Sequence, residues 1–153
     1  MQKFHELLQR GGVWFSIPPT NPELFIKESI HAFRLPSGIK EQVLLAQTLE
    51  REALVSTAMG KGIALPHPKT LLAQKIEDSF IALAYPRFPV QWKSPDGQGV
   101  RAAFFVVSAN QQEHLAALSS IAKLCVDPGF LELLYGEAGL TELLEMIRTD
   151  YPD

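Results

Sequence analysis

Cysteine, long apolar runs and excess positive charge are all scarce in this chain. Its single cysteine, Cys125, excludes an internal disulfide and a zinc site built on cysteines. No apolar run approaches the roughly 18–20 residues of a membrane-spanning helix, and residues 1–12 contain no apolar core of a signal peptide. The formal net charge of −3 argues against a nucleic-acid-binding surface. These absences predict a soluble, cytoplasmic protein.

Length and composition indicate one domain with a buried core. With 153 residues and 46% hydrophobic content, the chain is long enough for one such core, whereas two domains would each be too small. Helix-like and strand-like segments alternate along it, which favours an α/β layered fold. We predict a single domain over residues 1–153, with residues 1–12 as a possible N-terminal extension left from a removed upstream domain.

Hydrophobic patterns and capping residues predict the secondary structure. The predicted strands cover residues 13–17, 63–65, 79–85 and 101–108, and the continuous hydrophobicity of the last two indicates strands covered on both faces. The predicted helices cover residues 2–9, 22–33, 38–55, 110–126 and 140–149, with a shorter one closing at 133–136. Asn21, Ser37 and Asn110 are the predicted N-caps. Turns are expected at residues 16–22 and at the Asp-Gly pair 96–97.

The segment from Arg51 to His67, REALVSTAMGKGIALPH, is the most informative part of the chain. Its histidine follows a proline at the close of a short apolar run, and Gly60 and Gly62 relax the backbone just upstream. This arrangement fits a histidine at the exposed end of a strand, where the imidazole can act as a nucleophile or proton carrier. For an arbitrary Pro-His pair, a surface histidine in a loop is the commoner explanation.

The same segment resembles the active-site motif of the type-2 IIA domains of the bacterial phosphoenolpyruvate-dependent phosphotransferase system. That family comprises the fructose, mannitol and nitrogen-regulatory IIA proteins, and its motif reads roughly R-E-x-x-x-S-T-G-[IV]-G-x-G-[IV]-A-[IVL]-P-H. The residues that fit it are Arg51, Glu52, Ser56, Thr57, Gly60, Gly62, Ala64, Pro66 and His67. The resemblance extends from about residue 13 to residue 148. It implies the mannitol-type IIA fold: α/β, with a small, mixed, mostly parallel sheet flanked by helices on both faces.

The chain departs from this pattern at three positions. Ala58 stands where the family usually has glycine, Met59 where it has a β-branched residue, and Pro68 where glycine or alanine is common. Proline at that position stiffens the loop and removes a backbone donor beside the histidine. Alanine at position 58 is strained only if the backbone there requires a positive φ. None of these changes alters the imidazole itself.

His67 is the predicted catalytic nucleophile, with His114 as a second catalytic histidine. An unperturbed histidine pKa near 6.5 leaves the imidazole mostly neutral at cytoplasmic pH. His114 opens the segment HLAALSSIAKL, whose apolar residues follow at helical spacing, so it points along the apolar face toward the core or a cleft. A core histidine bonded to a backbone carbonyl is the competing explanation. The resemblance implies instead that His114 donates a hydrogen bond to the phosphoryl group or orients His67.

Three further residues are candidates for holding the phosphoryl group. Arg51 ends the third predicted helix, and its guanidinium suits phosphoryl oxygens and stays charged. A solvated ion pair with a neighbouring glutamate is the alternative, and the resemblance assigns the matching arginine to the active site. Ser56 and Thr57 are predicted phosphate-binding residues that supply hydroxyl or backbone donors, unless they merely cap the turn.

These residues predict a phosphoryl carrier that needs no cofactor. The chain contains no Walker A loop and no dinucleotide fingerprint, so phosphate must arrive from another protein or a small donor. The resemblance implies the histidine phosphocarrier protein HPr, or its nitrogen-branch paralogue, as the donor. It also implies that the phosphoryl group passes to a IIB domain, or that its presence controls binding to a regulated target protein. We expect no nucleic-acid partner and no insertion into a membrane. A regulatory, nitrogen-type role is favoured over a sugar-specific (fructose or mannitol) role because no IIB or IIC domain is fused to the chain.

Two other classes of function compete with this prediction. A phosphorylation-independent protein-binding module would keep the fold, but it would not need His67, His114 and Arg51 together. A metal site on the two histidines lacks a persuasive third ligand, because nothing in the spacing recruits Glu113 or Asp78. We therefore expect no metal.

Overall fold

Two fully buried strands form the centre of the sheet. In the computed structural model, which describes residues 1–18 and 21–153, β4 (Phe80–Pro86) and β5 (Ala102–Val107) are buried at every position. They pair antiparallel, with Ile81 opposite Val106. Alternate side chains point to opposite faces of the sheet, so each face must be covered separately. The turn predicted at residues 16–22 includes positions 19 and 20, which lie outside the described residues.

The sheet has five strands in the order β1-β4-β5-β3-β2. β1 (Val13–Ile17) lies parallel to β4, and β3 (Ile63–Ala64) lies parallel to β5. The other two pairs, β4 with β5 and β3 with β2 (Ala58–Gly60), are antiparallel. The sheet is therefore mixed, as predicted, but not mostly parallel. The physical reason is that each antiparallel pair consists of consecutive strands joined by a loop, whereas parallel neighbours need a longer crossover connection.

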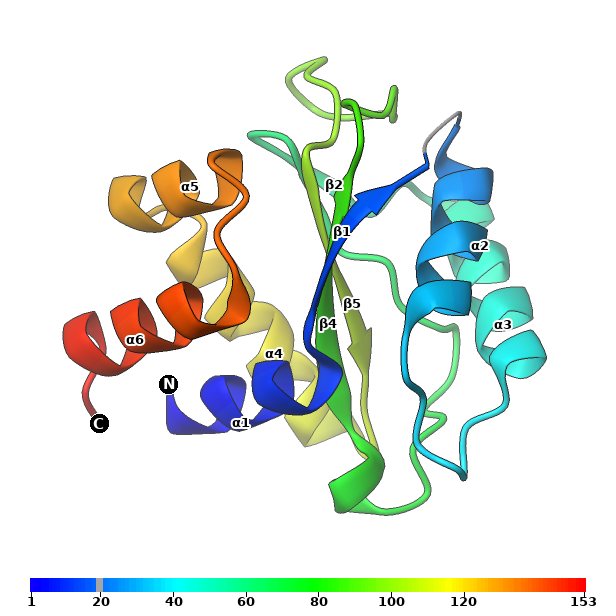
Figure 1. Cartoon of the computed structure of the whole chain (residues 1–153). Coiled ribbons are helices and arrows are strands. Elements are labelled where there is room, and N and C mark those ends of the chain that lie inside the picture. The colour runs from blue at the N-terminus through cyan, green and yellow to red at the C-terminus, as the bar shows by residue number, and fades with distance from the viewer. Residues whose placement is uncertain (19–20) are drawn as a thin grey trace.

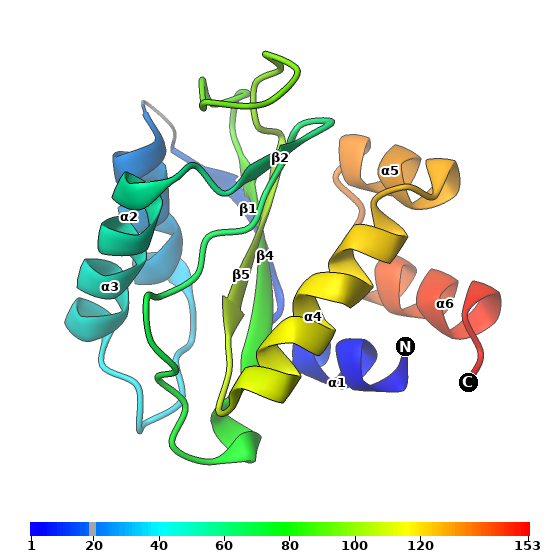
Figure 2. The same cartoon turned by 180° about the vertical axis from the view of Figure 1, so that it is seen from behind.

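Helices cover both faces of this sheet (Figure 1). One face carries α1 (Gln2–Gly11), α4 (Gln111–Leu124), α5 (Pro128–Tyr135) and α6 (Leu140–Asp150); the other carries α2 (Pro22–Ala32) and α3 (Glu41–Leu54). Figure 2 shows the same layers from behind, with a short 3-10 turn, η1 (Ile76–Asp78), below the sheet. Each layer has its own core, with Leu83 and Phe104 on the first face and Phe105 on the second. None of the described helices is both long and apolar enough to cross a bilayer.

Residues 1–12, considered above as an extension, contribute directly to the first core. Phe4 and Leu8 of α1 are buried, and the ring centroid of Phe4 lies 6.3 Å from that of Phe104. The helix approaches β4 so closely at Gly11 that a Cβ atom there would lie 2.0 Å from the carbonyl oxygen of Ile81. Glycine is therefore required at this contact, because any larger residue would push α1 off the sheet.

The predicted helix starts agree with the structure at two N-caps and differ at a third. The side chains of Asn21 and Asn110 each accept a hydrogen bond from the backbone N–H three residues further on. Ser37 is not an N-cap, because residues 37–39 form a turn that buries Ile39, and α3 begins only at Glu41. β2 was not predicted, since three residues are too few to show a periodic pattern.

Candidate functional site

His67 lies three residues beyond the C-terminal end of β3, the second strand of the β2–β3 hairpin. Gly60, Lys61 and Gly62 have φ angles of +94°, +57° and +77°, so the turn uses the left-handed region that favours glycine. Ala58 is not among the residues with positive φ, so alanine adds no backbone strain there. After β3, the carbonyl oxygen of Pro66 accepts a hydrogen bond from the backbone N–H of Val106 in β5 at 3.1 Å. The residue before His67 is thereby held against the central sheet.

The imidazole of His67 is held in one tautomer. Its Nδ1 atom lies 2.8 Å from the carbonyl oxygen of Leu65. A carbonyl can only accept, so Nδ1 carries the proton and Nε2 keeps its lone pair. Partial burial lowers the pKa of His67, the bond to Leu65 opposes that shift, and the positive charge of Arg51 lowers the pKa further. The ring is therefore neutral near pH 7, with a basic Nε2 available to react.

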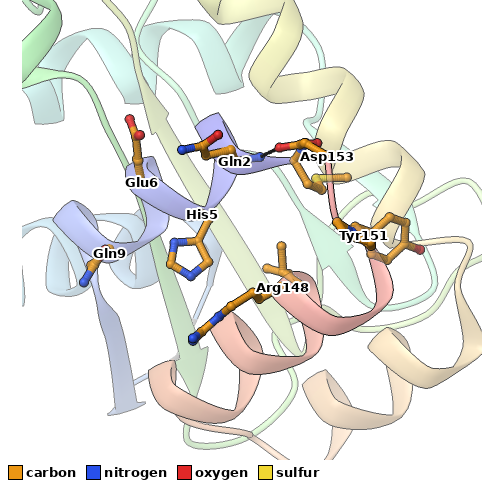
Figure 3. Close-up of a pocket in the computed structure, with 10 residues that line it drawn as sticks. Gln2, His5, Glu6, Gln9, Arg148, Tyr151 and Asp153 are labelled. Atoms are coloured by element: carbon orange, nitrogen blue, oxygen red, sulfur yellow. Dashed lines mark hydrogen bonds and ion pairs between the residues drawn. The ribbon is translucent and has the colours of Figure 1, made fainter.

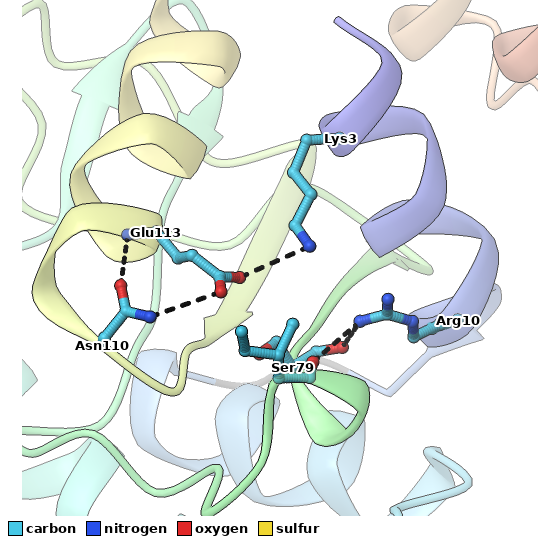
Figure 4. Close-up of polar contacts among 6 residues, drawn as sticks. Lys3, Arg10, Ser79, Asn110 and Glu113 are labelled. Atoms are coloured by element: carbon cyan, nitrogen blue, oxygen red, sulfur yellow. Dashed lines mark hydrogen bonds and ion pairs between the residues drawn. The ribbon is translucent and has the colours of Figure 1, made fainter.

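His114 lies beside His67, in the first turns of α4. The two ring centroids are 5.0 Å apart, and the ring planes are tilted by 56°. Figure 4 shows how this end of α4 is fixed: Asn110 and Glu113 bond to each other, and Lys3 of α1 approaches Glu113 at 3.7 Å. Burial, followed by the proximity of His67 and Arg51, lowers the pKa of His114. Both imidazoles therefore favour their neutral form.

The two histidines and Arg51 line one cavity of about 190 Å³. Its lining residues are Arg51, His67, Pro68, Lys69, Thr70, Leu71, Val106, Ser108, Gln111 and His114. Ser108 follows β5 and Gln111 is the first residue of α4, and neither was singled out from the sequence. The sequence pattern could have identified both residues, because they lie where a predicted strand ends and a predicted helix begins. Backbone N–H groups at such a helix N-terminus commonly bind anions.

Arg51 reaches this cavity from the opposite helical layer. It lies in the last turn of α3, and its Nη1 atom donates to the carbonyl oxygen of Val55 at 2.6 Å. Four other N–H donors of the guanidinium remain for a ligand. Across the described part of the chain, no carboxylate oxygen lies within 4.0 Å of it. The competing explanation, a surface ion pair with a neighbouring glutamate, therefore has no support in the geometry.

Ser56 and Thr57 lie outside the lining of the cavity. The Ser56 hydroxyl donates to the carbonyl oxygen of Lys93 at 2.5 Å, and its oxygen accepts from the backbone N–H of Ala58. Thr57 is buried, and both its backbone N–H and its hydroxyl donate to the carboxylate of Glu52. Their hydroxyls are thus engaged within the protein, and phosphate binding by these two residues stays a prediction.

The loop after His67 is fastened to α3. The backbone N–H of Lys69 donates to the carbonyl oxygen of Gln47, and the Lys69 ammonium contacts Glu50 at 2.9 Å. The backbone and hydroxyl of Thr70 both donate to the Gln47 side chain. Pro68 directly precedes these anchors and is buried. On its other side, the Pro66 carbonyl oxygen is bonded to Val106, so the loop that carries the family departure at position 68 is fixed on both sides of the proline.

The other two histidines lie away from this cavity. Figure 3 shows His5 on α1, facing Arg148 of α6 across a separate cavity of about 630 Å³. His31 is exposed on α2 and contacts Glu41 at 3.0 Å. Within residues 1–18 and 21–153, no group of three His, Cys, Asp or Glu side chains is placed to hold a metal ion.

Comparison with known proteins identifies relatives of this architecture. The nitrogen regulatory protein of Bradyrhizobium diazoefficiens is 36% identical over 93 residues, which are 60% of this chain and 59% of that protein. The mannitol-specific phosphotransferase enzyme IIA component of Geobacillus stearothermophilus is 32% identical over 112 residues, 73% of this chain and 75% of that protein. The chain also matches the multiphosphoryl transfer protein of Shigella flexneri, at 29% identity, but spans only 12% of its length.

Solved structures show the same fold. The nitrogen regulatory protein IIA-Ntr of Neisseria meningitidis superposes with a TM-score of 0.79 at 23% identity, over 94% of this chain and 97% of that chain. IIA mannitol of Escherichia coli superposes with a TM-score of 0.66 at 20% identity, over 87% and 95%. These matches confirm the predicted mannitol-type IIA fold, and the relatives support the nitrogen-regulatory branch. The profile described as "Phosphoenolpyruvate-dependent sugar phosphotransferase system, EIIA 2" matches residues 20–149, and the chain therefore belongs to that family.

Proposed function

We propose that this protein is a phosphoryl carrier that accepts a phosphoryl group on Nε2 of His67 from an HPr-type phosphocarrier protein. The observation that supports this most is the state of His67: a neutral ring, its Nδ1 bound to Leu65 and its Nε2 free, beside His114 and Arg51. Phosphoryl transfer depends mainly on such positioning and on charge stabilisation. The cytoplasmic location predicted from the sequence is part of this proposal.

The proposed step exchanges one N–P bond for another. The lone pair on Nε2 of His67 attacks the phosphorus of the donor's phosphohistidine, and the donor's N–P bond breaks with its electron pair returning to the donor nitrogen. Nε2 carries no proton, so none has to be removed. The ring becomes positively charged as the bond forms, and the carbonyl oxygen of Leu65 stabilises that charge through Nδ1–H.

The phosphoryl oxygens meet donors from both helical layers. Arg51 offers guanidinium N–H groups from α3, and His114 in its neutral form offers one ring N–H from α4. Gln111, the first residue of α4, also lines this cavity, so the positive N-terminal end of the helix dipole faces the phosphoryl group as well. These groups balance the negative charge of the phosphoryl group without a metal ion.

The size and rim of the cavity favour a protein as the donor. At about 190 Å³ the cavity is smaller than the roughly 300–1,000 Å³ of typical small-molecule sites. Leu71 at its lining and Leu115, next to His114, expose 42% and 55% of their surface. Exposed apolar side chains beside a polar cavity are typical of protein docking. A phosphocarrier could cover the rim while its histidine enters the cavity.

The subsequent partner distinguishes two roles within this proposal. The nitrogen-regulatory relatives favour a regulatory role, in which the phosphorylation state controls binding to a target protein. The mannitol IIA relative supports the alternative, in which His67 passes the group to a IIB domain. A protein-binding module that acts without phosphorylation is the third candidate, and it has no use for the neutral His67 and its free Nε2.

Intact-mass spectrometry tests the proposal directly. The protein is incubated with phosphoenolpyruvate, enzyme I and an HPr-type phosphocarrier, and kept away from acid. We expect an acid-labile gain of one phosphoryl group, which is lost in His67→Ala and kept in the control His31→Ala. Full labelling of His67→Ala would place the acceptor elsewhere, and no labelling with several phosphocarriers would favour the binding module. Adding a fructose- or mannitol-type IIB domain then separates the two roles, because only a sugar-type IIA loses its label to it.

A further inference from the structure

Glu52 follows Arg51 in α3, and its carboxylate accepts three hydrogen bonds. Oε2 accepts from the backbone N–H of Thr57 at 2.8 Å and from Nε1 of Trp92 at 2.9 Å. Oε1 accepts from the Thr57 hydroxyl at 2.6 Å. No basic group among the described residues pairs with this carboxylate within 4.0 Å. Glu52 therefore acts as a fixed internal acceptor and not as one half of a surface ion pair.

These bonds join segments that lie far apart in the sequence. Thr57 is buried directly before β2, and Trp92 is buried in the loop between β4 and β5. The Trp92 ring packs edge-on against Phe25 of α2, with the ring centroids 6.1 Å apart. Beside this contact, the Ser56 hydroxyl bonds the carbonyl oxygen of Lys93. The short turn that follows Glu52 is thereby closed onto the body of the protein.

This closed turn carries the acceptor that orients Arg51. The carbonyl oxygen of Val55 accepts from Nη1 of Arg51 at 2.6 Å. The Val55 side chain is 67% exposed, so its own packing does little to hold that carbonyl in place. The position of the carbonyl depends instead on the hydrogen bonds at the end of the turn, where Thr57 meets Glu52.

We propose that Glu52 is a positioning residue for phosphoryl transfer: by closing the turn onto Thr57 and Trp92, it fixes the Val55 carbonyl that aims Arg51 into the cavity beside His67. The inference rests on the proposed function, since it assigns a role within that reaction. It differs from the chemistry described above, because Glu52 does not line the cavity. It acts on the reacting atoms only through Arg51.

Glu52→Gln tests this role with little change in side-chain shape. The backbone N–H of Thr57 and the indole N–H of Trp92 both donate to Oε2, and the glutamine oxygen can accept both, but it carries no negative charge. The amide NH₂ then faces the Thr57 hydroxyl, which loses its charged acceptor at Oε1. We expect the rate of phosphoryl transfer to His67 to fall roughly tenfold, the scale of one lost charge-assisted hydrogen bond. The matched control is Glu41→Gln, which changes the same residue type on the same helix, at a surface contact with His31. That control is expected to keep the wild-type rate.

A double-mutant cycle separates positioning from general structural support. If Glu52 acts through Arg51, Glu52→Gln changes the rate of the Arg51→Ala protein by less than about twofold. If the glutamate merely supports the fold, it slows transfer equally in both backgrounds, and the inference is overturned. A wild-type rate in Glu52→Gln alone overturns it as well. Failure of the wild-type protein to accept a phosphoryl group would instead defeat the proposed function.

Two further measurements apply if Glu52→Gln folds poorly or its rate is ambiguous. Trp92→Phe deletes the indole donor and keeps a ring against Phe25, and it is expected to slow transfer only when Arg51 is present. An equal effect with and without Arg51 contradicts the inference. NMR titration provides the second readout: the negative charge of Glu52 raises the pKa of His67, so Glu52→Gln should lower that pKa and Glu41→Gln should leave it unchanged.

Discussion

Nδ1 of His67 lies 2.8 Å from the carbonyl oxygen of Leu65, two residues earlier in the chain. The acceptor that fixes the imidazole is therefore part of the same short segment that leaves β3. Pro66 between them has a fixed φ, which limits how far the two residues can move relative to each other. The tautomer of this imidazole is consequently set by the local backbone and not by a distant side chain.

The bond to Leu65 predicts which nitrogen is phosphorylated. Nδ1 is occupied as a donor, so we expect phosphorylation of His67 to give the Nε2-phosphohistidine. Two-dimensional NMR of the ¹⁵N-labelled imidazole distinguishes the two isomers by their coupling patterns. Detection of the Nδ1-phosphohistidine would contradict the role that we assign to the Leu65 carbonyl.

His114→Ala is expected to slow phosphoryl transfer without abolishing it. The substitution removes one neutral hydrogen-bond donor beside the phosphoryl group, and a loss of about 10²–10³-fold in rate is typical for such a donor. Rapid-quench kinetics with the phosphorylated phosphocarrier measures the effect. His31→Ala, an exposed histidine on α2, is the control and should transfer at the wild-type rate. An unchanged rate in His114→Ala would leave this residue a structural role only.

The histidines should titrate in opposite directions from the ordinary value of 6.5. Burial lowers the pKa of His67 and of His114, whereas the hydrogen bond that His31 donates to the Glu41 carboxylate raises the pKa of His31. Transfer needs neutral His67, so the pH at which its rate falls to half should lie below 6.5. NMR titration of the ring protons gives all three pKa values in one experiment. A pKa of His67 above 6.5 would contradict the neutral, partly desolvated state described above.

The same shifts predict how stability depends on pH. Below pH 6.5 the unfolded chain binds protons at His67 and His114 that the folded protein does not, so the free energy of unfolding falls as the pH drops through the unfolded pKa. Above that pH the two residues contribute no further dependence. Urea denaturation at about pH 5 and about pH 7.5 measures this difference. It should shrink in His67→Ala, and an undiminished difference would mean that other groups cause it.

Gly62 should tolerate substitution poorly, because its φ of +77° lies in the left-handed region. Gly62→Ala is expected to lower the free energy of unfolding by about 1–2 kcal/mol, the usual cost for a residue with a Cβ atom. The neighbouring Lys61 already adopts a φ of +57°. Lys61→Gly is therefore the matched comparison, and we expect it to be neutral or slightly stabilising. Thermal or urea unfolding compares the two, and equal destabilisation would argue against backbone strain as the cause.

Much of the fold could be predicted because it depends on local patterns. The continuous apolar runs identified β4 and β5, and two of three N-caps were correct because an asparagine side chain bonds its own helix start. Ser37 failed as a cap because a buried turn around Ile39 delays the helix. The prediction of a mostly parallel sheet was wrong. Strand direction depends on how the connections between strands pack and not on the sequences of the strands themselves.

The candidate site divides in the same way. By itself, the sequence determined that a histidine follows a short strand, that a second lies on the apolar side of a helix, and that an arginine ends a third element. Tertiary structure alone decided that all three line one cavity, because the chain after β3 continues beside β5, where Val106 bonds Pro66, and α3 brings Arg51 from the other helical layer. It also brought the indole N–H of Trp92 to the carboxylate of Glu52, 40 residues away in the sequence. Local propensities act over a few residues, whereas these contacts between distant residues depend on long-range packing that no short segment specifies.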